Sequence, residues 1–367
     1  MRIVYFTHSL VSCWNHGNAH FLRGLLRELD ARGHDVQAFE PEHGWSRDNL
    51  LADHGEQAVA AFQSSFPDLS PRTYTRDTDL AALLDGADIV VVHEWNEPWL
   101  VAAVAKLRRH GGSFRLLFHD THHRAVSDPA AMRSLDLSAY DAILAFGETL
   151  AAVYRDWGWD DRVLVLHEAA DTLLFHPSSS PVPREGLVWI GNWGDGERSE
   201  ELVEFLLAPA HDSGLPLDIH GVRYPLAALT MLHEYGARYH GWLANAEAPA
   251  TFARYMATVH VPRRFYTQSL PGIPTIRVFE ALACGIPLVC APWQDSEHLF
   301  TPGKDYLVAR DGAEMRGHLT SLANDPGLCE RLAAHGLATI AARHTCGHRA
   351  DELLQFVDRL QSIEVVS

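Results

Sequence analysis

The chain of 367 residues contains 47% hydrophobic and 21% charged residues, a balance that is typical of a folded globular protein and excludes a disordered one. Its length predicts two domains, each large enough to bury a core without disulfide or metal staples. The 30 Lys and Arg residues stand against 47 Asp and Glu, a formal net charge of −17. We therefore expect no broad basic face that would bind nucleic acid or an anionic membrane.

The cysteines predict a reducing compartment. Their number is odd and no CxxC pair occurs, which argues against a disulfide framework and a thiolate zinc site; they are Cys13, Cys284, Cys290, Cys329 and Cys346. No run of about 18 uncharged apolar residues occurs, so neither a signal peptide nor a membrane span is expected. A cytoplasmic location is the resulting expectation.

The N-terminal half alternates short β-branched runs with stretches of helical periodicity. Predicted strands are Arg2–Thr7, Asp35–Phe39, Ile89–His93, Arg115–Phe118, Ala142–Ala145 and Val163–Leu166. Predicted helices are Ala19–Ala31, Pro98–Arg109 and Glu148–Asp156. Most of these strands are apolar on both faces, which is typical of a parallel sheet covered by helices.

A segment rich in proline and serine, Asp171–Glu185, predicts a domain linker, because neither a helix nor a central strand tolerates it. The pattern then restarts. Predicted strands are Gly186–Ile190, Leu217–His220, Tyr239–Trp242, Thr258–Val261, Pro287–Cys290 and Tyr306–Ala309, and predicted helices are Ser199–Leu207, Pro225–Glu234, Ala248–Tyr255, Thr275–Ala283, Ala313–Asn324 and Leu328–Arg343. We expect domains at 1–170 and 186–345, with a final segment, 346–367, whose helix Arg349–Gln361 packs back on the first domain.

Ligands of such sheets bind beyond the carboxyl ends of the strands, so the polar clusters there are the candidate sites. The loop after the first strand carries Asn15, His16 and Gly17, which form either a plain helix start or a surface facing the acceptor. No GxGxxG follows any strand, so a dinucleotide fingerprint is absent.

Two further strands of the first half end in dense polar clusters, HEWNEPW from His93 and HDTHHR from His119. Three interpretations stay open: a metal site of His and carboxylate ligands, a sugar pocket, or histidines satisfied by the backbone. The candidate catalytic residues are His93, Glu94, His119 and Asp120, and candidate acceptor-side residues are Trp95, His122 and His123.

The second half carries features suited to a phosphorylated ligand. The glycine-rich loop after its first strand contains Gly191, Asn192 and Gly194, and the adjacent Arg263 and Arg264 end another strand. Glycines let the backbone approach a ligand, and guanidinium groups donate paired hydrogen bonds to phosphate. A loop made of Gly272, Ile273, Pro274 and Thr275 opens a helix whose dipole favours an anion.

Glu280 lies midway along that helix in an apolar stretch, and a lone buried carboxylate is costly unless it accepts hydrogen bonds. The two hydroxyls of a ribose would supply them.

These motifs, with PxxRxFEALACGxP at residues 274–287, resemble the donor half of GT-B glycosyltransferases. Over nearly the whole chain, including HEWN, FHDTHH, FGE, HEAADTLLFHP and HVPRR, the sequence is similar to bacterial spore-maturation-type glycosyltransferases of polysaccharide gene clusters. The resemblance implies two facing Rossmann-like domains and a ribose-binding role for Glu280. A second glutamate that such families carry eight residues earlier is here Gly272, which leaves open whether the reaction retains or inverts configuration.

We interpret the chain as a glycosyltransferase that moves a sugar from a nucleoside-diphosphate sugar to an acceptor hydroxyl in an interdomain cleft. A UDP-sugar is favoured over a GDP- or TDP-sugar, and no cofactor and no metal are expected, because the arginines and loop amides can stabilise the leaving pyrophosphate. Asp120 is the expected base if the reaction inverts configuration. Alternatives are a nucleotide-sugar epimerase, a metal-dependent hydrolase and a nucleotide-sugar binding protein without turnover.

Overall fold

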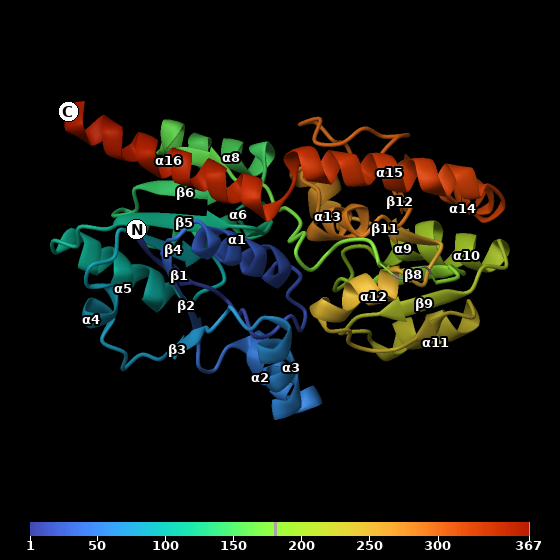
Figure 1. The fold of residues 1–367 in the computed structure, drawn as a ribbon, viewed down its shortest axis with the longest axis horizontal. Coiled ribbons are helices and arrows are strands. Elements are labelled where there is room, and N and C mark those ends of the chain that lie inside the picture. Colours follow the sequence, from blue (N-terminus) through green and yellow to red (C-terminus); the bar gives the residue numbers. More distant parts are fainter. Residues whose placement is uncertain (180–181, 367) are drawn as a thin grey trace. The chain divides into compact units, whose positions relative to one another are not determined.

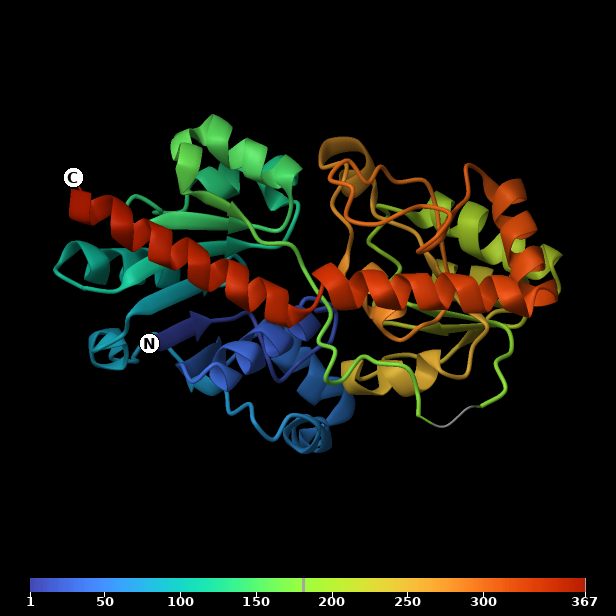
Figure 2. The ribbon, with the colours of Figure 1, turned by 45° about the horizontal axis from the view of Figure 1, so that its top comes forward.

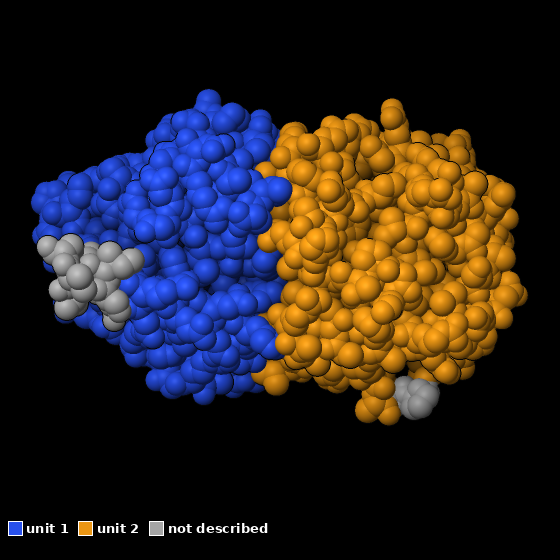
Figure 3. All heavy atoms as spheres, turned by 90° about the horizontal axis from the view of Figure 1, so that it is seen from above, with its two compact units in different colours: residues 1–168, 346–367 blue, residues 169–345 orange. Residues whose placement is uncertain are grey.

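The computed structural model describes residues 1–179 and 182–366, with the backbone alone from residue 361 onward. The predicted linker and the predicted C-terminal segment both extend over residues outside this range. The chain divides into two compact units, residues 1–168 with 346–367 and residues 169–345 (Figure 3). The boundary at Glu168 and Ala169 assigns the described part of the proline-rich segment to unit 2 rather than to a separate linker.

Unit 1 is built on a parallel sheet, seven-stranded within the described residues, in the order β3-β2-β1-β4-β5-β6-β7. This is the strand order of a Rossmann fold, with the topological switch between β1 and β4. The strands are β1 (Arg2–Phe6), β2 (Asp35–Pro41), β3 (Arg72–Tyr74), β4 (Ile89–His93), β5 (Arg115–Asp120), β6 (Ala142–Ala145) and β7 (Val163–Val165). β4 and β6 are buried along their whole length, as their continuous apolar runs predicted (Figure 1).

Helices cover both faces of this sheet. They are α1 (Ala19–Ala31), α2 (Trp45–His54), α3 (Glu56–Ser65), α4 (Leu80–Leu84), α5 (Pro98–Arg109), α6 (Arg124–Ser127), α7 (Pro129–Arg133), α8 (Glu148–Tyr154) and α16 (Cys346–Val366), with a π-helical turn η1 (Arg155–Trp159) and a 3-10 turn η2 (Asp160–Arg162). The C-terminal helix α16 packs beside α1 (Figure 2), where Arg32 Nε donates to Asp351 Oδ1 at 2.8 Å. The predicted return of the last helix to the first domain is therefore confirmed.

Unit 2 repeats the same architecture with a parallel sheet, six-stranded among the residues described, in the order β10-β9-β8-β11-β12-β13. The strands are β8 (Leu187–Ile190), β9 (Leu217–His220), β10 (Arg238–Tyr239), β11 (Ala257–His260), β12 (Leu288–Cys290) and β13 (Leu307–Val308). The helices and helical turns are α9 (Ser199–Leu202), η3 (Val203–Leu207), α10 (Ala208–Asp212), α11 (Leu226–Glu234), η4 (Asn245–Glu247), α12 (Ala248–Phe252), η5 (Phe265–Ser269), α13 (Ile276–Ala283), α14 (Gly312–Asn324) and α15 (Pro326–Arg343).

The predicted α/β class with two Rossmann-like domains is confirmed, but several elements differ from the prediction. The sequence analysis predicted nothing between residues 40 and 88, where the structure has β3 and three helices. The outer strands predicted at Tyr239–Trp242 and Tyr306–Ala309 shorten to two residues each, because edge strands have only one hydrogen-bonded neighbour. The predicted helix Ser199–Leu207 continues to Asp212 as three short helical pieces, with Pro209 at the start of the last.

Candidate active site

In unit 1, the register of two neighbouring strands brings the predicted histidine clusters together. β4 and β5 pair in parallel so that His93 lies opposite His119, and the two imidazole centroids are 5.5 Å apart. Glu94 follows His93, while Asp120 ends β5. The carboxyl ends of parallel strands meet at one edge of a sheet, and these four candidates do lie at the same end, as the sequence analysis predicted.

A row of imidazoles extends from this pair. The ring of His16 lies 6.3 Å from that of His93 and 5.0 Å from that of His8, and the hydroxyl of Tyr5 forms a hydrogen bond with His119 Nδ1. Burial lowers the pKa of all four histidines, to about 4 for His8 and about 3 for His119. The row is therefore neutral at physiological pH, so it offers hydrogen-bond donors and acceptors rather than positive charge.

Asp120 has a pKa that suits a general base near neutral pH. Burial raises its pKa to about 6, and two hydrogen bonds limit the rise: the Tyr154 hydroxyl donates to Oδ2 at 2.6 Å and the His122 amide donates to Oδ1 at 3.0 Å. A carboxylate with this pKa is ionised at neutral pH and can still accept a proton.

Glu94 differs from Asp120 in its surroundings. Its side chain is buried, and burial together with the neighbouring Asp120 raises its pKa well above the usual range. Arg124 opposes this rise through an ion pair at 3.1 Å, and its guanidinium also lies 4.4 Å from the ring centroid of Trp95. Trp95 in turn contacts His122, with centroids 4.9 Å apart. Trp95 and His122, predicted on the acceptor side, thus lie in one contact network with Glu94, predicted as catalytic; both roles stay predictions.

The remaining acceptor-side candidates of unit 1 have different surroundings. Asn15 adopts a left-handed backbone conformation with φ 48°, and Gly17 is exposed. The ring centroid of His123 lies 3.9 Å from that of His122, so His123 belongs to the same network, and its Nδ1 lies 2.9 Å from Ser127 Oγ.

None of the groups of His, Cys, Asp and Glu among the described residues has three members placed to hold a metal ion. The imidazole nitrogens of the row differ in their partners. His93 Nε2 lies 3.0 Å from the hydroxyl of Thr121, whereas Nε2 of His16 and Nε2 of His119 are buried without a hydrogen-bond partner among the described residues.

In unit 2, the glycine-rich loop after β8 holds an arginine that the sequence analysis did not select. Arg198 donates from Nη1 to the carbonyl of Val261 at 2.8 Å and from Nη2 to the carbonyl of Asn192 at 2.7 Å. Its Nε is buried without an acceptor within the described residues. Gly194 makes room for it, because a Cβ at this position would lie 2.9 Å from Arg198 Nε and its φ of 94° disfavours other residues.

The environment of Arg198 is electropositive. Burial, together with the nearby guanidinium groups of Arg263 and Arg277, lowers its pKa to about 9. Neither of its hydrogen-bond acceptors is a carboxylate. An anion bound here would reverse this unfavourable charge crowding.

The adjacent arginines of the predicted pair have different surroundings. Arg263 forms an ion pair with Glu197 at 3.1 Å and lies close enough to Arg198 to affect its pKa. Arg264 pairs with Glu201 at 2.7 Å and is more exposed. The structure thus brings Arg263, but not Arg264, into the electropositive cluster.

The burial predicted for Glu280 is correct, but the expectation of a lone carboxylate is wrong. Its side chain is fully buried on α13, accepts a hydrogen bond from Asn245 Nδ2 at 2.8 Å and forms an ion pair with Arg277 one helical turn earlier. The carboxylate therefore has protein partners, and its ribose-binding role stays a prediction.

The loop from Gly272 to Thr275 is fixed on both sides. The ring of His260, at the end of β11, lies with Nε2 3.1 Å from the hydroxyl of Thr275, and burial lowers the pKa of His260 to about 3. Gly272 has φ 102°, and a Cβ there would meet Ser296 Oγ at 2.0 Å. A larger side chain, including the glutamate of related families, does not fit this conformation. The loop still presents the first-turn N–H groups of α13 to an anion.

The sequence matches two families, one in each half. Residues 16–172 match the family described as "Glycosyltransferase Family 4", and residues 198–355 match the family described as "Glycosyl transferase-like".

The chain is a glycosyltransferase of the GT-B fold. No curated protein matched its sequence. Solved structures similar to this glycosyltransferase include sucrose-phosphate synthase from Thermosynechococcus elongatus, with a TM-score of 0.65, 14% identity and coverage of 99% of this chain and 100% of the other. The HepE protein of Anabaena in complex with UDP and glucose has a TM-score of 0.68 at 13% identity, covering 98% and 100%. The β-glucosyltransferase of phage T4, in complex with UDP-glucose, has a TM-score of 0.59 at 13% identity, covering 99% of each chain.

These matches favour sugar transfer over the epimerase and hydrolase alternatives. In the part of the glycosyltransferase that the structure describes, none of the helices has the length and apolarity of a membrane span.

The sequence analysis missed several residues of the candidate site. They are His8, Tyr154 and Arg124 in unit 1 and Arg198 and Arg277 in unit 2. Four of them had a signal: His8 lies directly beyond a predicted strand, Arg124 ends the cluster HDTHHR, Arg198 ends the glycine-rich loop, and Arg277 is the arginine of the motif before FEALACG.

Proposed function

We propose that unit 2 binds the nucleoside-diphosphate part of a sugar donor and that unit 1 supplies the base that activates the acceptor hydroxyl. The observation that carries the first half is Arg198, a guanidinium held by two backbone carbonyls and crowded by two further arginines. A pyrophosphate placed here relieves this repulsion, and the α13 N-terminus adds partial positive charge.

The transfer requires one proton to be removed and one anion to leave. The acceptor oxygen forms a bond to the anomeric carbon, the bond from that carbon to the phosphate oxygen breaks, and the nucleoside diphosphate departs with the bonding electrons. Asp120 takes the hydroxyl proton, for which its pKa of about 6 is suited. Arg198, Arg263 and the loop Gly272 to Thr275 stabilise the departing charge.

A UDP-sugar is the donor we propose, supported by the UDP and UDP-glucose in the two complexes of similar fold. Metal-independent transfer is part of the proposal, because the arginines of unit 2 provide positive charge at the expected position of the pyrophosphate. One complex of the phage T4 enzyme contains UDP and Mn²⁺, so the metal requirement of this chain is tested directly below.

We base the proposed biological role on the resemblance to bacterial glycosyltransferases. We place the chain among bacterial spore-maturation-type glycosyltransferases of polysaccharide biosynthesis, acting in the cytoplasm on a glycan or small-molecule hydroxyl. Five free cysteines support a reducing compartment.

A thermal-shift series with UDP, GDP, TDP and ADP, each with and without chelator, tests the donor site. At a concentration of 100 times Kd, a ligand adds about 2.7 kcal/mol, which raises Tm by roughly 5 to 10 °C for a domain of this size. We expect UDP to give the largest shift and chelator to leave it unchanged. Absence of any nucleotide-dependent shift would refute the donor site, and loss of the shift with chelator would refute metal independence.

A second assay separates transfer from epimerisation. The protein is incubated with the donor alone and with the donor plus a hydroxyl acceptor, and sugar and nucleotide are followed separately. Transfer predicts a glycosylated acceptor only in the second mixture. A donor that changes its sugar configuration without acceptor would establish the epimerase instead.

A further inference from the structure

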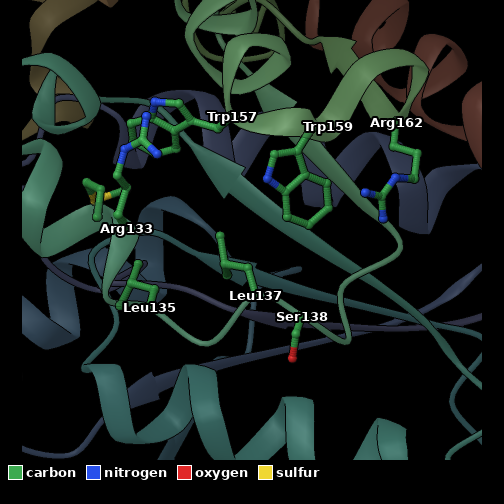
Figure 4. Close-up of a pocket in the computed structure, with 8 residues that line it drawn as sticks. Arg133, Leu135, Leu137, Ser138, Trp157, Trp159 and Arg162 are labelled. Atoms are coloured by element: carbon green, nitrogen blue, oxygen red, sulfur yellow. The ribbon is translucent and has the colours of Figure 1, made fainter.

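Unit 1 contains a hollow on a different group of segments from the histidine row. Its cavity volume is about 300 Å³. Figure 4 shows side chains that converge on it from the loop after α7 and from the turn after α8. Two tryptophans, two leucines and two arginines line it: Trp157, Trp159, Leu135, Leu137, Arg133 and Arg162.

The backbone of the Trp157–Trp159 turn is built to bring both indoles to this hollow. Gly158 separates them with φ 93°, and Asp160 directly after them has φ 44°. Such positive φ values reverse the chain within a few residues and are costly for a residue with a Cβ, such as Asp160. The glycine ends the helical segment and the turn after it carries Trp159 beside Trp157.

Both arginines are solvent-exposed and lie close to the two indoles. The Arg133 guanidinium carbon lies 4.3 Å from the ring centroid of Trp157, and that of Arg162 lies 4.5 Å from the ring centroid of Trp159. Within the described residues neither guanidinium has a carboxylate within 4 Å or a hydrogen-bond acceptor. In a chain with a net charge of −17, two such arginines at one hollow mark a site for an anion.

We propose that this hollow is a binding subsite for an acidic saccharide, one whose sugar rings carry carboxylate or sulfate groups. Indole surfaces and leucines contact the apolar C–H faces of pyranose rings, while the two guanidinium groups pair with the anionic substituents. Both tryptophans are half-buried and line a concavity. Side chains that insert into a membrane protrude from the surface, so a concave site fits a soluble glycan better than a lipid surface.

The subsite is connected to Asp120 through one side chain. The ring centroid of Trp157 lies 5.2 Å from that of Tyr154, and the Tyr154 hydroxyl donates to Asp120 Oδ2 at 2.6 Å. An occupant that shifts Trp157 therefore also shifts a hydrogen-bond donor of the proposed base. This connection rests on the proposed function, whereas the binding of an acidic saccharide does not.

Titration calorimetry with the full chain tests the binding, with trigalacturonic acid as the probe and neutral galactotriose as its uncharged counterpart. Arg133→Gln and Arg162→Gln each remove one charge from the hollow, and Trp159→Ala removes one indole. Arg155→Gln is the matched control, since Arg155 belongs to the same turn but pairs with Glu148 outside the lining.

We expect trigalacturonic acid to bind, with an affinity that falls as salt rises, and galactotriose to bind about tenfold more weakly. Arg133→Gln, Arg162→Gln and Trp159→Ala should each weaken binding of the acid about tenfold, while Arg155→Gln leaves it unchanged. No detectable binding, or equal losses in all four variants, would overturn the proposal. So would binding to anionic lipid vesicles that depends on Arg133 and Arg162 and is not displaced by the trisaccharide, because the hollow would then be a membrane contact. The donor-site experiments above are independent of these outcomes.

Discussion

Substitution of Asp120 by Asn tests the proposed base most directly, because burial gives this residue a pKa of about 6 against an ordinary value of 3.8. The substitution keeps the shape of the side chain and an oxygen that can accept from Tyr154 or His122, but it removes the ability to take a proton. It should therefore change two pH-dependent quantities, the rate of transfer and the free energy of unfolding.

The rate follows from the ionisation of Asp120. A base must be unprotonated, so kcat/KM of the unsubstituted protein should rise with pH through about 6 and then level off. Asp120→Asn should lose this limb and lower the plateau by about 10²- to 10⁴-fold, while the affinity for UDP, which we assign to unit 2, stays unchanged. In a retaining reaction Asp120 only orients a hydroxyl, and the loss should be well below that range.

The raised pKa of Asp120 also predicts how the free energy of unfolding changes with pH. A carboxyl whose pKa is raised in the folded state holds its proton more tightly than it does in the unfolded chain. Its contribution to stability is fully present below pH 4 and is lost as pH rises through 6. The difference of about two pKa units corresponds to about 3 kcal/mol, a component that should be absent in Asp120→Asn.

Urea unfolding at a series of pH values and initial rates over the same range provide both measurements. Asp77→Asn, at an exposed position of the same unit, is the matched control and should reproduce both profiles of the unsubstituted protein. A variant Asp120→Asn that keeps the acidic limb and the plateau rate would refute the assignment of the base. An unchanged pH dependence of unfolding would refute the raised pKa on which the reasoning depends.

Three further predictions concern the electropositive cluster of unit 2. Arg198→Gln should abolish the UDP-dependent thermal shift, because it removes the guanidinium that has no carboxylate partner. Arg263→Ala should lower kcat/KM about tenfold or more. Arg264→Ala should change kcat/KM less than about threefold, because the ion pair of Arg264 with Glu201 is more exposed. Equal effects of the two substitutions would exclude Arg263 from the site. Gly194→Ala should weaken UDP binding by displacing Arg198, measured by calorimetry, and normal binding would show that this close contact is dispensable.

The spacing of apolar residues predicted the strands and helices whose burial follows a regular pattern along the chain. The buried strand Ile89–His93 is apolar on every position but the last, so both its place in a parallel sheet and the polar cluster after it were predictable. The region between residues 40 and 88 was not, because its elements carry weak patterns. Two of the three residues of β3 are exposed, and helices α2 and α3 meet at Gly55 with few buried positions.

Side-chain partnerships across the sheet were beyond sequence reasoning. Tyr154 ends a helix with apolar spacing and so resembles an ordinary core residue, although its hydroxyl donates to Asp120 from 34 positions away. Asn245 approaches Glu280 from a separate turn 35 residues earlier. Arg277 lies three residues before Glu280, a spacing that does predict contact on a helix, although the apolar surroundings of Glu280 suggested a lone carboxylate. Such partners are selected by tertiary packing, which has no period along the chain.

Burial disfavours the charged form of the ionisable groups in both units, but with different results. In unit 1 it keeps histidines neutral and raises the pKa of Asp120 to about 6, so this unit can exchange a proton near neutral pH. In unit 2 Arg198 keeps its charge although burial and two neighbouring arginines lower its pKa to about 9. Charge retained against such a cost requires a compensating anion, and proton exchange requires a group that titrates. A hydrolysis that releases no anionic leaving group would need only the titrating carboxyl group of unit 1. Transfer from a nucleoside-diphosphate sugar needs both this group and the buried arginine of unit 2.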